Sequence, residues 1–566
     1  MRYVEGKNRS QREALPPSLD ERIRGDHPIR VVDAFVEGLD IEGLGFVHAE
    51  PAETGRMAYD PRDLLKLYLY GYMNRVRSSR RLMRECGRNI EVMWLLNSLT
   101  PDFHTISDFR KDNRKAIKEV FRAFVQILIE MKLLGGEEFS VDGTKVRAWN
   151  SIKRSYTPEV VEKKLAYIRD QMERLEAYLA DMDSYDTREE TLHLDLSKEQ
   201  MPGKLAELRE RVKKYEGYKA RFAAGEKQIL ETDPDSRTLH SKDGLHPAYN
   251  VQSAVDTQSH LIADFEVTNA NTDQNLLSVM GEKVKESLDV GNVQVIADKG
   301  YESREDIERC VMNGIVPDVG FKYDKTERVF TLDHVEAEIT EAQRISTKPE
   351  DIQACLHAGE LPRCYEGTNI RVEVQGLSEV SCFVRHEDGT VTCPMGRTLY
   401  KRVEKKLGIQ YGSQEACRTC PNRCTDSKGA KTVLIGYNSN CVPVLMYGSS
   451  QYALQKPPQD AKISPYNHAL DRKSRAKSQV KLTIRRDIAK QQIRKETAEH
   501  PFGTLKWYDG YHYFLCKGKE NVAAETALSY LSYDLKRAIV LTTSEHSPVP
   551  GILMHLRAKN QGKRVG

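Results

Sequence analysis

The sequence predicts a mixed α/β protein with a helical amino-terminal region, an inserted helical hairpin and a cysteine-rich insertion. Three observations lead to this fold class. Apolar residues recur at helical spacing up to about residue 135, a heptad seam follows residue 157, and a period of two begins at residue 246. A chain of 566 residues is also too long for one hydrophobic core.

The amino-terminal region, residues 1–135, is expected to be all-α. Asp60-Pro61 marks a helix start, with an Asp cap followed by proline at the first helical position. A second helix is expected from about Ser107 to Leu128. Residues 74–88 carry six arginines and one glutamate, a net of +5, and such a run indicates contacts with phosphate unless it is a solvated helix face. Its arginines are Arg75, Arg77, Arg80, Arg81, Arg84 and Arg88.

A short strand with Asp142 and Gly143 at its end is expected within residues 136–156, and an antiparallel helical hairpin over 157–228. Residues 229–319 then read as strands at 249–256, 261–267 and 293–297, with helices at 272–288 and 303–313. Residues 320–470 look irregular and rich in Cys, Gly and Pro, so we expect an insertion. Residues 471–566 are expected to complete the core, with a basic, helix-prone stretch and a closing helix at 517–543.

Two aspartates and one glutamate are the candidate catalytic residues. Asp142 and Asp298 each follow a hydrophobic strand, where α/β proteins commonly place their sites, although a turn or cap role is the usual one for such residues. Glu499 lies in a segment, residues 471–506, with eleven Lys/Arg against four Asp/Glu, a net of +7. Phosphodiester cleavage by two Mg²⁺ ions roughly 3.5–4 Å apart needs such carboxylates and no His or Cys ligand.

The chain resembles DDE-type bacterial insertion-sequence transposases with an RNase H-like catalytic core. The resemblance is carried by Val141-Asp142-Gly-Thr-Lys145, by Ala297-Asp298-Lys-Gly-Tyr301 and by a Tyr-x2-Arg-x3-Glu-x6-Lys signature. In that signature Glu499 and Lys506 match, whereas Gln492 replaces the Tyr and Lys495 the Arg, with Arg494 adjacent. Lysine keeps the charge but loses the bidentate fork.

The resemblance implies that Asp142, Asp298 and Glu499 are metal ligands, with Glu496 as the rival for the third position. It implies two Mg²⁺ ions, for which Mn²⁺ can substitute. It also implies that an amino-terminal helical domain binds the ends of the element. Phosphate contacts near the scissile bond are expected from Lys506, Lys495, Arg494 and Lys299.

The cysteine group Cys417-x2-Cys420-x3-Cys424 lies downstream of Cys393. Four thiolates would bind a structural Zn²⁺ in a zinc-ribbon-like insertion, with Cys382 or His386 as alternatives to Cys393. Unmetallated buried thiols are the other interpretation. Trp149, Trp507 and Tyr508 are expected to pack in the core or hairpin, with stacking on a nucleotide as the alternative.

These features together predict a DNA transposase that cuts at terminal inverted repeats and joins the freed 3′-hydroxyl to target DNA. Its partners would be double-stranded DNA and a second copy of the chain. The sequence has no membrane-spanning apolar run and no signal-peptide core, so we expect a cytoplasmic, nucleoid-associated bacterial protein. The alternatives are an RNase H-like nuclease or resolvase without strand transfer, and a domesticated DNA-binding protein that no longer catalyses.

Overall fold

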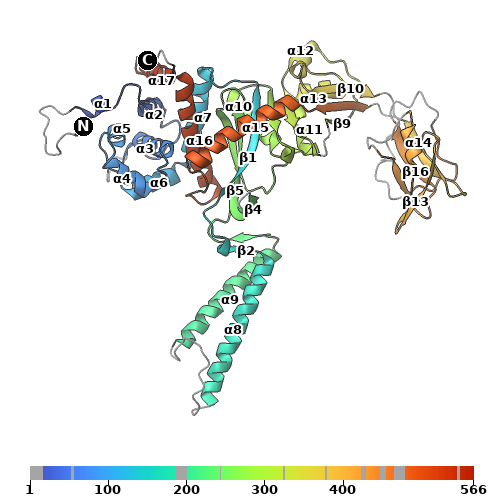
Figure 1. The fold of residues 1–566 in the computed structure, drawn as a ribbon, viewed down its shortest axis with the longest axis horizontal. Coiled ribbons are helices and arrows are strands. Elements are labelled where there is room, and N and C mark those ends of the chain that lie inside the picture. Colours follow the sequence, from blue (N-terminus) through green and yellow to red (C-terminus); the bar gives the residue numbers. More distant parts are fainter. Residues whose placement is uncertain are drawn as a thin grey trace, which may run out of the picture. The chain divides into compact units, whose positions relative to one another are not determined.

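The structure is a computed structural model that describes residues 17–51, 57–184, 200–241, 244–322, 326–375, 379–421, 429–446, 454–464, 479–544 and 549–565. Its contacts divide the chain into two compact units. Figure 1 shows the helices and strands, coloured from the amino terminus to the carboxyl terminus. Unit 1 comprises residues 1–289 and 492–566, and unit 2 comprises residues 290–491. No helix of the described residues is long and apolar enough to cross a membrane.

The amino-terminal part of unit 1 is helical, as predicted. The Asp60 carboxylate accepts a hydrogen bond from Arg62 N and caps α3. The single helix expected from Ser107 to Leu128 is instead two helices, because α6 ends at Asn113, whose side chain donates to Phe109 O. The helices are α1 (Leu19–Arg22), α2 (Pro28–Glu37), α3 (Pro61–Met73), α4 (Ser79–Cys86), α5 (Ile90–Leu95), α6 (Phe103–Asp112) and α7 (Arg114–Glu130).

An antiparallel sheet forms the centre of unit 1. Strand β5 (Gly244–Asp256) pairs with β1 (Glu138–Arg147), β4 (Arg237–Ser241) and β6 (Ile262–Thr268). The sequence predicted a short first strand that ends at Asp142. The strand is in fact ten residues long and places Asp142 within it, opposite Ser253.

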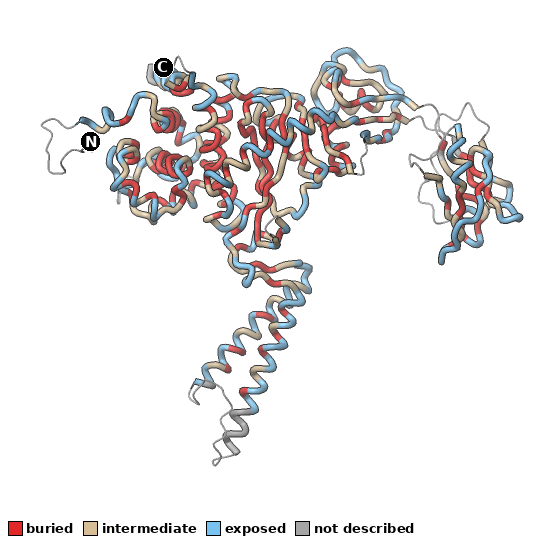
Figure 2. Tube along the Cα trace, viewed as in Figure 1, coloured by how far each residue is buried: buried red, intermediate tan, exposed pale blue. Residues whose placement is uncertain are grey.

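Helix α16 (Lys519–Thr542) is the central helix of unit 1. It is buried on all sides from Val522 to Leu535 and packs against α7, α3 and β6, as its red trace in Figure 2 indicates. Its amino terminus is capped by two aspartates, since Asp233 accepts from Gly518 N and Asp235 from Lys519 N. Helices α10 (Leu277–Leu288) and α17 (Gly551–Val565) complete this unit.

The predicted helical hairpin is present as α8 (Pro158–Ser184) and α9 (Met201–Ala223), closed at its base by the two-stranded pair β2 (Ser155–Tyr156) and β3 (Ile229–Leu230). The heptad residues Val161, Leu165 and Ile168 are buried against α9, so the seam holds the hairpin together. The seam residues Leu179 and Met182 lie outside the described side chains.

Unit 2 begins with a parallel pair, β7 (Val293–Ala297) and β8 (Ile315–Val319), connected through η2 (Lys299–Tyr301) and α11 (Arg304–Met312). The region 320–470, expected to be irregular, instead contributes strands to two sheets. One is antiparallel, in the order β10-β17-β9, with its central strand β17 (Gln479–Arg485) beyond residue 470, and the other has six strands in the order β15-β14-β13-β12-β11-β16. Its short strands are joined by Gly-containing turns, which hide the alternating pattern in the sequence.

The elements of this region have the following bounds. They are β9 (Glu327–Asp333), α12 (Glu341–Ile345), α13 (Pro349–Ala358), η4 (Arg363–Tyr365), β10 (Ile370–Gln375), β11 (Glu379–Arg385), β12 (Val391–Thr392), β13 (Thr398–Lys405), β14 (Gly408–Gly412), α14 (Gln414–Arg418), β15 (Thr432–Ile435), β16 (Cys441–Met446) and β17 (Gln479–Arg485).

The basic stretch 471–506 is only partly helical. Residues 471–478 lie outside the described residues, and β17 is a strand with alternating burial. Helix α15 (Ile488–Gly503) follows, and a π-helical turn, η6 (Thr504–Tyr508), continues it.

Candidate active site

Asp142 points from the middle of β1 in unit 1. Its Oδ1 accepts a hydrogen bond from Gly143 N at 2.8 Å, and its Oδ2 lies 3.8 Å from Arg494 Nη1. The side chain is partly exposed, so a ligand can reach it. Asp142 is thus a carboxylate beside a cation on α15.

Arg494, next to the lysine that replaces the signature arginine, lies beside Asp142. Its side chain is mostly buried next to Asp142, whereas Lys495 is exposed on α15. The backbone carbonyl of Arg494 accepts from Ser140 Oγ at 3.4 Å, which joins α15 to β1. Arg494 Nε is buried without a hydrogen-bond partner among the described residues. Such a donor suits an anionic oxygen that enters the site from outside.

Glu499 is exposed on α15, five residues after Arg494. The rival acid Glu496 is also exposed. Burial lowers the pKa of His260, and the negative charge of Glu496 partly offsets that decrease. Glu496 therefore acts electrostatically on the turn between β5 and β6. Gln492 is exposed, and Lys506 is partly buried in η6.

Asp298 lies in unit 2, directly after β7. Its Oδ1 accepts from Gly300 N at 2.7 Å, so it caps η2. Gly320, directly after β8, approaches closely: a Cβ there would lie 3.1 Å from Lys299 N and 3.6 Å from Gln491 Oε1. Gln491 also donates to the buried Asp318, whose pKa is raised by burial. The start of α15 is therefore fixed beside the strand end that carries Asp298.

Gly143 shows why a glycine follows the first aspartate. A Cβ at this position would lie 2.3 Å from Gln252 Nε2 and 2.8 Å from Asp273 Oδ1. Asn250 and Gln252, both buried, donate to that Asp273 oxygen at 2.7 and 2.8 Å. This amide–carboxylate cluster holds β1 and β5 at the position of Asp142. Asp273 was not singled out from the sequence, because it lies in a polar loop.

A second cluster holds the carboxyl-terminal half of α15. The Tyr533 hydroxyl donates to His260 O at 3.0 Å and contacts His500 Nδ1 at 2.9 Å. The two histidine rings lie 5.0 Å apart, and burial, with Arg537 nearby, lowers the pKa of both. His500, next to Glu499, thus has a local structural role through its contact with Tyr533.

The donor set of the three acids fits Mg²⁺, since all three offer hard carboxylate oxygens. Among the described residues, no three His, Cys, Asp or Glu side chains form a group arranged to hold a metal ion.

The arginines of residues 74–88, called the arginine block below, are not all exposed as the prediction of phosphate contacts requires. Five of them are exposed, but Arg77 is buried and donates to Tyr513 O and Gly510 O at 3.1 and 2.7 Å. It also lies 3.5 Å from the buried Glu525. The prediction that Arg77 contacts DNA is therefore wrong, because its guanidinium is already used inside unit 1.

The other block arginines have different surroundings. Arg75 lies over the Tyr508 ring, Arg80 over Phe103, and Arg88 pairs with Glu85. Arg81 and Arg84 are exposed on α4, outside its buried face.

The cysteine group is partly visible in unit 2. Burial raises the pKa of Cys393, and the charges of Cys420 and Cys417 raise it further. Cys424 lies outside the described residues. Cys382 is instead buried with Cys441 in a separate cluster, and His386 bonds to Thr392 Oγ1.

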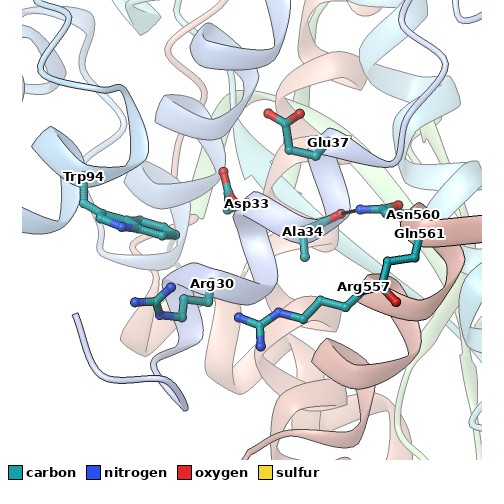
Figure 3. Close-up of a pocket in the computed structure, with 8 residues that line it drawn as sticks. All are labelled: Arg30, Asp33, Ala34, Glu37, Trp94, Arg557, Asn560 and Gln561. Atoms are coloured by element: carbon teal, nitrogen blue, oxygen red, sulfur yellow. Dashed lines mark hydrogen bonds between the residues drawn. The ribbon is translucent and has the colours of Figure 1, made fainter. Parts of the chain in front are cut away.

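A polar pocket of about 310 Å³ lies between α2, α5 and α17 in unit 1. Arg30 and Arg557 extend toward one side of it in Figure 3, and Arg30 lies 4.9 Å from the Trp94 ring centre. Arg30 forms an ion pair with Asp20. Asn560 of α17 donates to Ala34 O of α2, so the pocket is lined by helices from near both ends of the chain. None of the predicted catalytic residues lines it.

The exposed aromatic residues also differ from expectation. Trp507 is 80% exposed, Tyr508 61% and Trp149 49%. The expectation of core or hairpin packing is therefore wrong for these side chains.

Comparison with known proteins identifies two transposase domains in the chain. Residues 17–112 match the model of a transposase domain, DUF772, and residues 220–350 match the model of a transposase DDE domain. No curated protein matches the chain. Among solved structures, a piggyBac transposase synaptic complex with hairpin DNA matches at 7% identity, over 94% of this chain and 79% of that chain, with a TM-score of 0.29. A score that low carries no argument about fold or function.

The chain therefore contains a transposase DDE domain preceded by a transposase-type helical domain, and it is an enzyme of DNA transposition. The matched DDE segment includes Asp298 but neither Asp142 nor Glu499.

Proposed function

We propose that the chain binds the terminal inverted repeats of an insertion sequence, cleaves DNA at its ends and transfers the 3′-hydroxyl to target DNA. The observation that carries this proposal is the approach of Arg494 to Asp142, from the helix that also bears Glu499. It places a phosphate-binding cation beside a carboxylate in a chain with a transposase DDE domain.

The fold supports an RNase H-like core. Unit 1 supplies an antiparallel set of strands with Asp142 on β1, and unit 2 supplies a parallel pair with Asp298 after its first strand. Antiparallel and parallel strands are both components of the mixed sheet that the resemblance implies.

Asp142, Asp298 and Glu499 would hold the Mg²⁺ ions, as the resemblance implies. When bound, Mg²⁺ would activate the attacking water or hydroxyl and stabilise the leaving oxygen in an in-line displacement at phosphorus. The chain's own cations orient the substrate. Arg494 would donate its unpartnered buried Nε–H to a phosphate oxygen, and Lys299, Lys495 and Lys506 would bind neighbouring phosphates.

The exposed arginines of α4 would hold the DNA farther from the cut. Arg81 and Arg84 lie on one face of that helix, and their contacts would be salt-dependent and independent of sequence. Holding two element ends at once implies at least a dimer in the active complex.

Strand transfer separates the proposed function from a nuclease that only hydrolyses. The substrate would be precut duplexes that carry the imperfect inverted repeats flanking the gene, incubated with the purified chain, Mg²⁺ and a supercoiled target. Covalent joining of the end to the target is expected. Hydrolysis without joining would favour the nuclease, and binding without either reaction would favour a non-catalytic DNA-binding protein.

A further inference from the structure

The loop that follows α15 presents aromatic side chains to solvent instead of burying them. Trp507 and Tyr508 belong to the π-helical turn η6, and Tyr513, 48% exposed, follows five residues after Tyr508. Trp507 and Tyr508 keep more than half of their surface in water and Tyr513 about half, which is costly where the exposed rings gather unless a partner covers them. π-helical turns are rare and occur frequently at functional sites.

Two arginines accompany these rings. The guanidinium carbon of Arg75 lies 5.7 Å from the Tyr508 ring centre, and that of Arg77 lies 5.1 Å from the Tyr513 ring centre. Arg75 has a φ of +62°, in the left-handed region that is uncommon for residues other than glycine. Its cation is exposed while its backbone is held in an unfavourable conformation, a combination that is concentrated at binding sites.

The loop is rigidly attached to the strand that carries Asp142. Arg77 holds its backbone through the carbonyls of Gly510 and Tyr513. Arg147, the last residue of β1, donates its N–H to His512 O at 3.2 Å and accepts from Phe514 N at 2.9 Å. The aromatic rings are therefore positioned before any partner arrives, all within unit 1.

We propose that Arg75, Trp507, Tyr508 and Tyr513 form a stacking surface for the unpaired bases of single-stranded DNA. Exposed aromatic rings next to arginine are the combination that binds single strands, since the rings stack on bases and the cation pairs with phosphate. A base inside a duplex is already stacked on its neighbours and cannot lie on a ring in this way. A protein partner would not require the exposed Arg75 cation beside the Tyr508 ring.

The surface deepens the proposed function, because a cut staggered between the two strands at an element end would expose unpaired bases. The binding itself requires no metal and none of the three acids. It can therefore be measured without Mg²⁺ and succeeds or fails independently of catalysis.

Binding of a fluorescently labelled single-stranded oligonucleotide to the full chain in EDTA tests the proposal, with the duplex of the same sequence as reference. Trp507→Ala and Tyr508→Ala are each expected to weaken single-strand binding about tenfold, since stacking contributes roughly 1–3 kcal/mol per base. Trp507→Phe should largely retain binding. Duplex binding should change by less than about twofold, because the duplex uses phosphate contacts elsewhere.

Tyr167→Ala is the matched control. Tyr167 is 60% exposed on α8, as Tyr508 is on its turn, but it has no arginine over its ring among the described contacts. This variant should bind single strands as the wild type does. Unchanged single-strand binding by Trp507→Ala and Tyr508→Ala, or equal loss on single strands and duplex, would overturn the proposal.

Discussion

Arg77 and Arg81 show how differently two arginines of one basic run are used. Composition identified the run as a candidate phosphate-binding surface. Composition alone could not show that Arg77 is buried and Arg81 exposed. The groups that bury Arg77, at Gly510 and Tyr513, lie more than 400 positions away in the sequence. The period of α4, by contrast, could have predicted that Arg81 lies outside the buried face formed by Leu82, Glu85 and Cys86.

Arg77→Met should therefore destabilise the chain, whereas Arg81→Met should not. Loss of Arg77 leaves Glu525 charged and buried without its cation, at a cost of about 3–5 kcal/mol. Urea unfolding followed by circular dichroism measures the shift. Arg81→Met should unfold within about 0.5 kcal/mol of wild type and should instead weaken DNA binding. Equal stability of both variants would contradict the structural role of Arg77.

Asp63 on α3 predicts a pH dependence of stability. Burial, together with Asp60, Glu37 and Asp33, raises its pKa to about 6, against the pull of Lys66. Because the folded state binds this proton more tightly, the contribution is present below pH about 4 and is lost as pH rises through about 6. Asp63→Asn should therefore be more stable than wild type at pH 7, by about 1 kcal/mol after allowance for solvent screening. No gain is expected at pH 4, and urea unfolding at both pH values checks this.

At the scale of elements, periodicity worked where strands and helices are long and failed where they are short. The hairpin helices, β7 and α16 follow from apolar spacing alone. The break at Asn113 and the strands of residues 320–470 do not, because a single cap or a two-residue strand changes the pattern too little. The register of β1 also escaped prediction, since Asp142-Gly143 reads as a turn. Close approach by Gln252, and not a turn, is what requires the glycine.

The position of α15 depends on Tyr533, which joins it to the turn after β5. Tyr533→Phe removes the hydroxyl that links His260 O to His500, worth about 1–1.5 kcal/mol. We expect cleavage to fall about five- to tenfold and the Mg²⁺ concentration for half-maximal cleavage to rise, because Glu499 adjoins His500. Tyr218→Phe removes a hydroxyl of the helical hairpin and should change neither quantity. A lower rate with unchanged Mg²⁺ dependence would argue against a positioning role.

At the scale of the whole molecule, the candidate catalytic residues are distributed over both units. Asp142, Arg494 and Glu499 belong to unit 1, and Asp298 and Lys299 belong to unit 2. The resemblance predicted the identity of these residues from short motifs. It could not predict that Arg494 rather than Lys495 approaches Asp142, since that depends on which face of α15 packs on β1.

The cysteine-rich part of unit 2 predicts bound zinc. The full chain, purified without chelator, should retain stoichiometric Zn²⁺ by elemental analysis, and Cys417→Ser and Cys420→Ser should lose it, because the charges of these thiols raise the pKa of Cys393. Cys382→Ser is the matched control and should keep the metal, since Cys382 pairs with Cys441 instead. Zinc-free wild-type protein, or loss of zinc from Cys382→Ser, would exclude this assignment.

The central claim is that Asp142, Asp298 and Glu499 act together as the ligands for catalytic Mg²⁺. Its most direct test is Mg²⁺-dependent cleavage of DNA carrying the element's own inverted repeats by Asp142→Asn, Asp298→Asn and Glu499→Gln, with Glu496→Gln as the matched control. Each of the three variants should bind the ends but cut none of them, and Glu496→Gln should cut as the wild type does. Wild-type cleavage by any of the three, or loss of cleavage in Glu496→Gln alone, would contradict the assignment.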